Sequence, residues 1–216
     1  MLSDQLGGEN RTTAAISELL ACVFRGEFKV GDRLTETFLS EKLGISRTPV
    51  REALLELKGL GLVDLRRNRG AVFNGFTTVK LSEIYEVRRL LEVEATRLST
   101  RRIDRQLLHD LIRDTRKLHD ANADDEDWEL DRRIHAAIAQ SCGNQMLAHE
   151  IQRFSMLVQA IRLTVGARVH VQHETTRQHL ELLAAMTDGN PDAAADSMRR
   201  HLEAAEKSAV AAIREW

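Results

Sequence analysis

Apolar residues in the N-terminal part of the chain recur at the three- and four-residue spacing of amphipathic helices. This spacing predicts three helices, which cover residues 11–25, a short stretch that Thr35 can cap, and residues 47–57. The positions predicted to be buried in them are Ile16, Leu19, Leu20, Val23, Phe24, Phe38, Leu39, Leu43, Val50, Ala53, Leu54 and Leu57. Only residues 44–46 separate the second helix from the third, and so tight a link is typical of a helix-turn-helix.

The start of the third helix carries residues that suit a helix N-terminus. Ser46 stands at the N-cap position, where its hydroxyl can accept from a first-turn N–H, and Pro49 falls in the first turn. Arg47 and Arg51 are four residues apart, so they share one exposed face. This end of a helix also carries partial positive charge. The two arginines together with the helix N-terminus can therefore bind phosphate oxygens or the O6/N7 edge of guanine. A surface helix with solvated arginines is the alternative.

Two short runs with the alternation of β-strands follow the third helix. They cover residues 62–65 and 71–73, and the turn between them, residues 66–70, carries three arginines. This pattern predicts a β-hairpin with a basic tip, which can reach a minor groove or the phosphates beside it. A basic hairpin tip is otherwise only a solvated turn, but beside a helix-turn-helix the favoured interpretation is DNA contact.

Beyond residue 77 the strand character ends and a series of six amphipathic helices follows. They are predicted to cover residues 79–100, 104–121, 127–141, 145–165, 169–187 and 191 almost to 216. The apolar stripe predicted to be buried includes Val87 in the first of these helices and Leu107 in the second. Asn144 and Asn190 stand at N-cap positions, and Pro191 occupies the first position of the last helix. Short links between helices predict an antiparallel bundle, in which metal and ligand sites are built from facing helices.

The predicted fold is therefore mainly α, with two domains. Residues 8–76 form a winged helix-turn-helix of three helices plus a β-hairpin wing. Residues 77–216 form an antiparallel all-α bundle of six or seven helices, which can hold ligand or metal sites between facing helices.

The composition of the chain limits which partners and which cellular compartment we expect for this protein. The formal net charge of the 216 residues is −2 at pH 7, but charge has to be read locally. From residue 47 to residue 70 cations outnumber anions by six to three, so the predicted reading surface is basic. Cys22 and Cys142 follow no metal or redox spacing, and no apolar run is long enough to span a bilayer. We therefore expect a soluble protein of a reducing compartment, the cytoplasm, with no membrane partner.

All eight histidines lie in the predicted bundle. Four side chains there can face one another from three helices: Asp131, His135, His179 and His201. Buried imidazoles and carboxylates need partners, and a divalent ion would satisfy all four, with zinc the commonest occupant and nickel or another transition metal the alternative. Spacing alone also allows a hydrogen-bonded His–Asp pair without metal, and His170 with His173 offers a competing pair on the helix of His179.

Several motifs of the N-terminal part stand together over residues 10–76. They are Gly31-Asp32-Arg33-Leu34, Glu36, LGISRTPVREAL at 43–54, Gly61-Leu62-Val63 and Asn68-Arg69-Gly70-Ala71. Together they resemble the winged helix-turn-helix of the GntR superfamily of bacterial transcription regulators. The operator contacts predicted with this resemblance are Arg33, Thr37, Ser46, Arg47, Thr48, Arg51, Asn68, Arg69 and Gly70. Some relatives carry an arginine at the position of Thr37. Any base contact that this chain makes there would come from a threonine and would differ from the arginine contact of those relatives.

The C-terminal part also carries a set of motifs, over residues 78–210. They are Asp131, Ile134-His135, Ser141-Cys142-Gly143-Asn144, Gln178-His179-Leu180, Ala184-Ala185-Met186, Gly189-Asn190, Ala195, Met198 and His201. They resemble the all-helical ligand-binding (FCD) domain of FadR-like GntR regulators. Many members of that subfamily bind a divalent ion through one Asp and three His, and the resemblance assigns these roles to Asp131, His135, His179 and His201.

The resemblance further implies a small carboxylate effector, which would fill the open positions of an octahedral ion. A guanidinium held in the bundle core would grip such a carboxylate bidentately. The resemblance favours Arg88 for this role, with Arg162 as a second candidate. A helix-surface salt bridge from Arg88 to Glu92 or Glu86 is the alternative.

The function expected from these features is a sequence-specific regulator of transcription, acting as a repressor. A homodimer would read both halves of a near-palindromic operator, and a carboxylate at the metal would control operator affinity. One alternative is a metal-dependent hydrolase-type enzyme, since an Asp/His₃ ion with open positions can activate water. Another is a regulator in which the metal is purely structural. No general base at a fixed spacing supports the enzyme.

Overall fold

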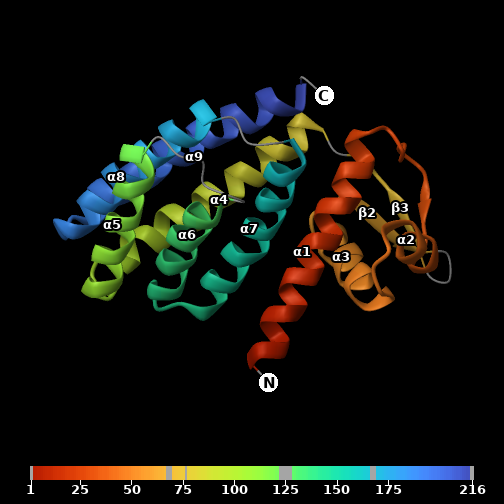
Figure 1. Ribbon diagram of the computed structural model, residues 1–216, viewed down its shortest axis with the longest axis horizontal. Helices are drawn as coiled ribbons and strands as arrows, with labels where there is room; N and C mark the ends of the chain where they lie inside the picture. Colours follow the sequence, from red (N-terminus) through yellow and green to blue (C-terminus); the bar gives the residue numbers. More distant parts are fainter. Residues whose placement is uncertain (1, 67–69, 76, 122–127, 166–168, 215–216) are drawn as a thin grey trace. The chain divides into compact units, whose positions relative to one another are not determined.

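A computed structural model describes residues 2–66, 70–75, 77–121, 128–165 and 169–214, which contain nine helices and three strands (Figure 1). The helices are α1 Leu2–Phe24, α2 Glu36–Leu43, α3 Arg47–Gly59, α4 Thr78–Ser99, α5 Arg105–Ala121, α6 Glu129–Ser141, α7 Gln145–Val165, α8 Val169–Thr187 and α9 Pro191–Arg214. The strands are β1 Arg33–Leu34, β2 Val63–Arg66 and β3 Gly70–Phe73. Two compact units result: Met1–Thr77 with Met156–Thr164, and Thr78–Ser155 with Val165–Trp216.

The first unit packs α1, α2 and α3 with a small antiparallel sheet of strand order β1-β3-β2. The predicted hairpin is confirmed: β2 pairs with β3, with Val63 opposite Phe73 and Arg66 opposite Gly70. The strand β1, which the sequence analysis did not predict, pairs Arg33 with Val72. Two residues are too few for an alternating pattern, so β1 is defined only by its hydrogen bonds to β3.

Several predicted helix caps are present. Thr35, Asn144 and Asn190 each accept a hydrogen bond from the backbone N–H three residues later, at 3.2, 3.1 and 3.1 Å. Ser46 does lie at the N-cap of α3, but its side chain makes no capping hydrogen bond, so this part of the prediction is wrong. Because Ser46 and the first residues of α3 are exposed, water can satisfy the N–H groups there instead.

The buried faces of three helices differ from the predicted stripes. Phe38, Val87 and Leu107 were predicted to be buried and are 45%, 38% and 38% exposed. Phe38 lies at the rim of the first unit, where its ring packs edge-on against Phe28 at 6.3 Å between centroids. On α5 the neighbouring Leu108 is buried instead of Leu107. The helix α1 also begins nine residues earlier than predicted.

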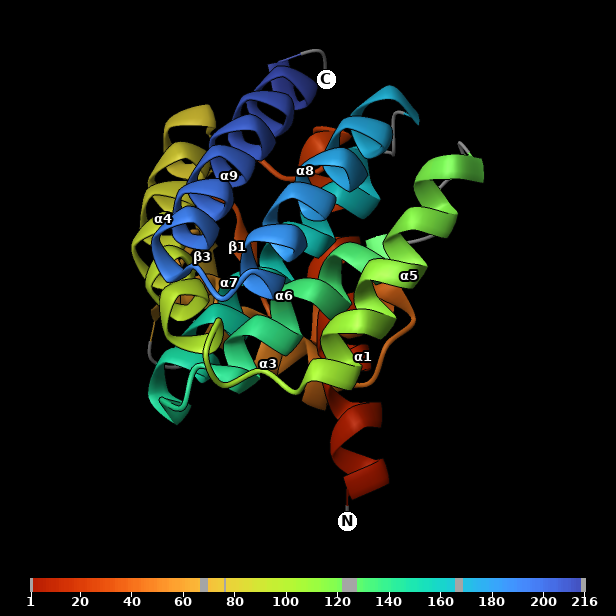
Figure 2. The same cartoon turned by 90° about the vertical axis from the view of Figure 1, so that its left-hand side faces the viewer.

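The second unit is the predicted all-helical bundle and consists of α4, α5, α6, α8 and α9 with the part of α7 up to Ser155. α9 packs along α4 and α8, α8 contacts α5, and α4 contacts α6 (Figure 2). Its apolar core includes Leu111, Ile134, Ile138, Ile151, Leu182, Leu183, Met186, Met198 and Leu202. None of the helices in the described ranges has the length and apolar content needed to cross a membrane.

The closest backbone approach in the wing predicts a stability difference between two glycine variants. Gly70 has φ +78°, and a Cβ there would lie 2.8 Å from the carbonyl oxygen of Leu34. Since a left-handed conformation costs other residues about 1–2 kcal/mol and backbone cannot easily move aside, Gly70→Ala should lower the free energy of unfolding by about 3 kcal/mol. Denaturant unfolding measures the loss.

Gly26→Ala is the matched control, because Gly26 also has positive φ, +71°, but an added Cβ would meet no atom within 4 Å. It should cost only about 1–2 kcal/mol. Equal losses in the two variants would contradict a close approach between β1 and β3.

Candidate metal centre and nucleic-acid interface

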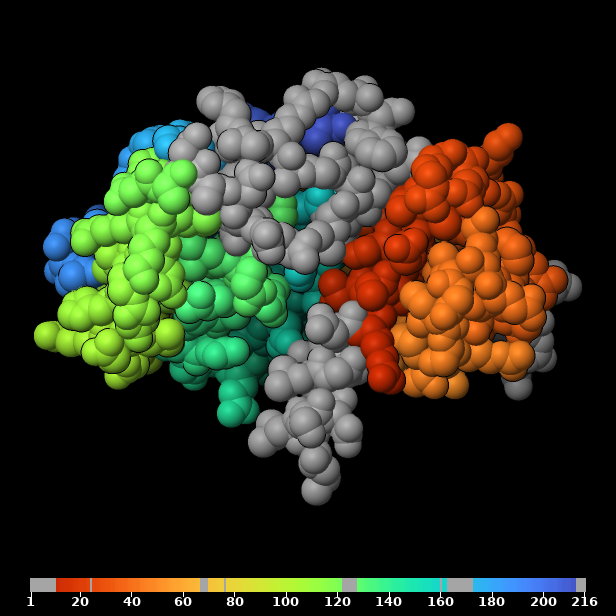
Figure 3. All heavy atoms as spheres, viewed as in Figure 1, coloured from red at the N-terminus to blue at the C-terminus, as the bar shows by residue number. Residues whose placement is uncertain are grey.

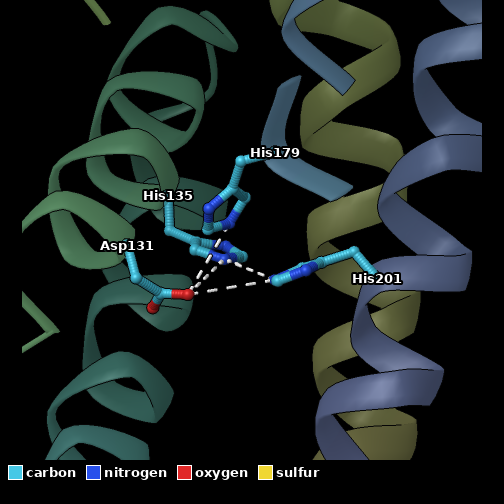
Figure 4. Close-up of side chains that lie close together, drawn as sticks. All are labelled: Asp131, His135, His179 and His201. Carbon is cyan, nitrogen blue, oxygen red and sulfur yellow. Dashed lines mark hydrogen bonds and ion pairs between the residues drawn. The ribbon is translucent and has the colours of Figure 1, made fainter. Parts of the chain in front are cut away.

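Three helices of the second unit bring one aspartate and three histidines together (Figure 4). Asp131 and His135 lie one turn apart on α6, while His179 comes from α8 and His201 from α9. One ligand atom of each residue lies within 4.8 Å of those of all the others, and all four side chains are buried. The four residues selected from the sequence therefore form a single buried cluster in the structure.

The distances inside the cluster approach those of ligands around one ion. His135 Nε2 lies 3.1 Å from His201 Nε2, and Asp131 Oδ1 lies 3.8, 3.6 and 4.0 Å from Nε2 of His135, His179 and His201. Ligand atoms about 2.1 Å from a shared ion are about 3.0–3.4 Å apart. Shifts of under about 1 Å would therefore place all four atoms around one cation.

Hydrogen bonds at the outer ring nitrogens determine which nitrogens face the centre. His135 Nδ1 lies against Glu92 Oε2, and His201 Nδ1 lies 3.2 Å from Gln178 Oε1. Both partners are acceptors, so both Nδ1 atoms carry the proton and both Nε2 atoms present lone pairs. Two lone pairs that face one another at 3.1 Å beside a carboxylate repel. The cluster therefore needs a cation, or an additional proton, between its members.

A buried ion pair on α4 adjoins the cluster. Arg88 Nε donates to Glu92 Oε1 at 2.7 Å, and both side chains are only 2% exposed. Burial raises the pKa of Glu92, but the charge of Arg88 and the hydrogen bonds from Arg88 and His135 outweigh it and hold the pKa at about 2. The salt bridge from Arg88 to Glu92 that the sequence analysis gave as an alternative is therefore present. It is buried inside the bundle and does not lie on the helix surface, as that alternative had assumed.

Two polar atoms of α4 beside this ion pair are buried and have no hydrogen-bond partner within the described part of the chain. They are Arg88 Nη1 and the Tyr85 hydroxyl. The guanidinium carbon lies 5.1 Å from the centroid of the Tyr85 ring, so the two groups are neighbours. Leaving a buried polar group without a partner costs about 1–3 kcal/mol. Oxygen atoms of a bound ligand would satisfy both groups.

Tyr85, Glu92 and Gln178 were not recognised as members of the site from the sequence. Tyr85, Arg88 and Glu92 recur at three- and four-residue spacing, on the face of α4 that also buries Leu81. That polar run on a buried face was the available signal for the first two residues. No sequence pattern indicated a contact between Gln178 and His201, because Gln178 is the neighbour of His179 in the sequence and lies on another helix than His201.

The second effector candidate, Arg162, is half-buried on α7. It belongs to the stretch Met156–Thr164, which groups with the first unit and not with the unit that holds the Asp131–histidine cluster. Its contact with an effector therefore stays a prediction.

The predicted DNA contacts of the first unit lie on exposed positions of α2, α3 and the sheet. Those that the structure describes as exposed are Arg33, Thr37, Ser46, Arg47, Thr48 and Arg51. Side chains of α3 line the surface of this unit (orange in Figure 3). A 3.9 Å ion pair links Arg51 to Glu36, but the Arg51 side chain is 71% exposed, so this contact holds it only weakly. Gly70 is half-buried, while Asn68 and Arg69 lie outside the described residues.

Comparison with known proteins decides the family. The model described as "Bacterial regulatory proteins, gntR family" matches residues 11–73, and the model described as "FCD domain" matches residues 83–204. The chain belongs to the GntR family of transcription regulators. The first match covers the winged helix-turn-helix, and the second covers all four residues of the Asp131–histidine cluster, so the GntR and FCD resemblances are both confirmed.

Individual relatives agree with this assignment. The HTH-type transcriptional regulator YdhC of Bacillus subtilis is 26% identical over 189 residues, which cover 86% of this chain and 84% of the relative. The HTH-type transcriptional repressor RspR of Escherichia coli is 26% identical, covering 80% and 77%. The solved structure of E. coli McbR/YncC shares the fold, with a TM-score of 0.66 and 23% identity over 97% and 96% of the two chains. The named relatives are regulators, which supports the prediction that this GntR protein is not an enzyme.

Removing the guanidinium of the buried ion pair should destabilise the bundle. Arg88→Met would leave the Glu92 carboxylate buried without its cation, which typically costs about 3–5 kcal/mol. Denaturant unfolding of the metal-free protein measures the loss. Arg97→Met is the matched control, since Arg97 lies on the same helix, makes exposed ion pairs with Glu94 and Asp192, and should lose far less. Similar losses in both variants would contradict the burial of the Arg88 pair.

Proposed function

We propose that this GntR regulator holds a divalent cation between Asp131, His135, His179 and His201, and that a small carboxylate bound beside this ion controls its affinity for operator DNA. The observation that carries the proposal is the meeting of imidazole lone pairs and a carboxylate in a buried cluster. Three imidazoles and one carboxylate suit zinc, which is our first expectation, and also nickel or a related transition metal.

The charges around the cluster favour an anionic effector. Arg88 and Glu92 neutralise each other, so the remaining fixed charge near the ion is that of Asp131. A dication there leaves one net positive charge inside the bundle, and a monocarboxylate would neutralise it. Four protein ligands also leave positions open on an octahedral ion.

Arg88 and Tyr85 supply the polar groups that would recognise this carboxylate. Arg88 Nε is engaged by Glu92, while Nη1 and the Tyr85 hydroxyl are buried without partners within the described chain. A carboxylate oxygen could accept from both groups while another oxygen binds the ion. The effector class is therefore a small acid, held by the metal on one side and by α4 on the other.

On the DNA side, the exposed arginines of α3 and β1 would contact a half-site, with the wing reaching the groove beside it. A homodimer would read two half-sites of a near-palindromic operator. The E. coli relative RspR is named a repressor, which supports repression as the mode of action here. The acid changes operator affinity only to the extent that it binds the DNA-free and DNA-bound forms differently.

Removal of the metal should lower the melting temperature of the full-length protein. Chelator-treated protein should regain stability on addition of zinc, by about 4 kcal/mol when zinc exceeds its dissociation constant a thousandfold. His179→Ala should abolish this gain, whereas His109→Ala, at an exposed position of α5, should keep it. Differential scanning fluorimetry and native mass spectrometry measure the two quantities. Absence of zinc and nickel binding would contradict the proposed metal centre.

Operator binding should depend on the N-terminal face of α3. With DNA selected from a random pool on the metal-loaded protein, Arg51→Ala should bind about 1–3 kcal/mol more weakly, because a bidentate base contact is lost. Lys117→Ala, an exposed cation on α5, serves as the charge-matched control and should bind normally. Fluorescence anisotropy gives the affinities, and unchanged binding by Arg51→Ala would remove this residue from the interface.

The same assay separates an effector-coordinating metal from a purely structural one. Acetate, lactate and citrate are suitable probes of the small acids that the site would accept. If the metal is structural, chelation will still lower the melting temperature, but none of these acids will change operator affinity or raise the melting temperature further.

A further inference from the structure

We propose that Glu92 is a positioning residue of the metal centre, which fixes the His135 ring with Nε2 towards the ion. The inference rests on the metal binding proposed above. It adds a fifth side chain, from α4, to a site whose four ligands come from α6, α8 and α9.

Both carboxylate oxygens of Glu92 are engaged by different donors. Oε2 lies against Nδ1 of His135, a residue 43 positions later on α6, and Oε1 accepts from Arg88 Nε at 2.7 Å. The Glu92 side chain is 2% exposed, so water does not compete for either oxygen. Glu92 thus connects the ring of a metal ligand with the guanidinium proposed to hold the effector.

The contact at Nδ1 determines what His135 offers to the ion. A neutral imidazole can carry its proton on either nitrogen, and only the unprotonated one can bind metal. An ionised carboxylate can only accept, so it keeps the proton on Nδ1, holds the ring orientation and raises the basicity of Nε2. The corresponding partner of His201 is the neutral amide oxygen of Gln178, which does this more weakly.

No close substitute for glutamate would serve both partners. Glutamine has one amide oxygen, so its NH₂ group would face a donor, either the Arg88 N–H or the His135 N–H. Aspartate is one methylene shorter and cannot reach as far. If Glu92 served only to fill space or to carry charge, it would not need to accept hydrogen bonds from Arg88 and His135 at the same time.

The decisive experiment compares the zinc affinity of Glu92→Gln with that of Glu94→Gln, on full-length protein shown to be folded by circular dichroism. Glu94 is the matched control, since it is an exposed glutamate on the same helix. Competition with a chromophoric chelator should show zinc bound about 10–100-fold more weakly by Glu92→Gln, with Glu94→Gln unchanged. Equal affinities in the two variants would overturn the proposal.

Arg88→Lys separates the contact with His135 from the ion pair. It keeps a cation beside Glu92 and should change zinc affinity by only a few fold. If it weakens zinc as much as Glu92→Gln does, the ion pair and not the His135 contact supports the site, and the proposal is wrong.

A measurement on the unmodified protein keeps the proposal testable if Glu92→Gln does not fold. Nitrogen-15 NMR of the zinc-loaded chain should show His135 protonated at Nδ1 and bound to zinc through Nε2. Zinc bound through Nδ1 would overturn the role of Glu92 while leaving the metal centre intact. Failure of the unmodified protein and of Glu94→Gln to bind zinc or nickel would instead contradict the metal centre itself, and the role of Glu92 with it.

Discussion

Burying charge inside a six-helix bundle is the constraint on which the second unit depends. Two carboxylates, one guanidinium and three imidazoles are withdrawn from water between α4, α6, α8 and α9. Each would be strongly unfavourable alone, and each is tolerated because an opposite charge or a hydrogen-bond partner stands beside it. The Arg88–Glu92 pair meets this requirement within the protein. In the Asp131–histidine cluster, a cation or an additional proton between the imidazole lone pairs and the carboxylate would meet it, and the proposed metal ion is such a cation.

The two units use arginine in opposite ways. The Arg51 side chain is 71% exposed and hydrated, and in the proposed DNA complex its hydration would be exchanged for phosphate or base contacts. Arg88 has already been desolvated on folding, at 2%, and its pairing with Glu92 offsets that cost in advance. An exposed arginine suits a long and variable partner such as DNA. A buried one would be pre-organised for the small anion proposed as the effector.

The differences between prediction and structure have local causes. Following the aliphatic residues of α4 led to a stripe that included Val87, whereas the buried face is rotated towards Tyr85, Arg88 and Glu92. Hydrophobic periodicity treats polar residues as outward-facing, and it fails where a helix buries charge to build a site. The short strand β1 was not predicted for another reason. It is defined only by its pairing with β3, and no local sequence pattern indicates that pairing.

The sequence by itself determined the helices of both units, the caps at Thr35, Asn144 and Asn190, the hairpin wing and the family, because each depends on spacing within one segment or on motifs preserved along the chain. Together with that resemblance it also indicated the four side chains of the Asp131–histidine cluster. Only the tertiary structure decided that Glu92 contacts His135, which ring nitrogens face the centre and which polar atoms of α4 are left without partners. These features arise where helices distant in sequence meet, and there the packing of side chains, and not their spacing, determines which atoms touch.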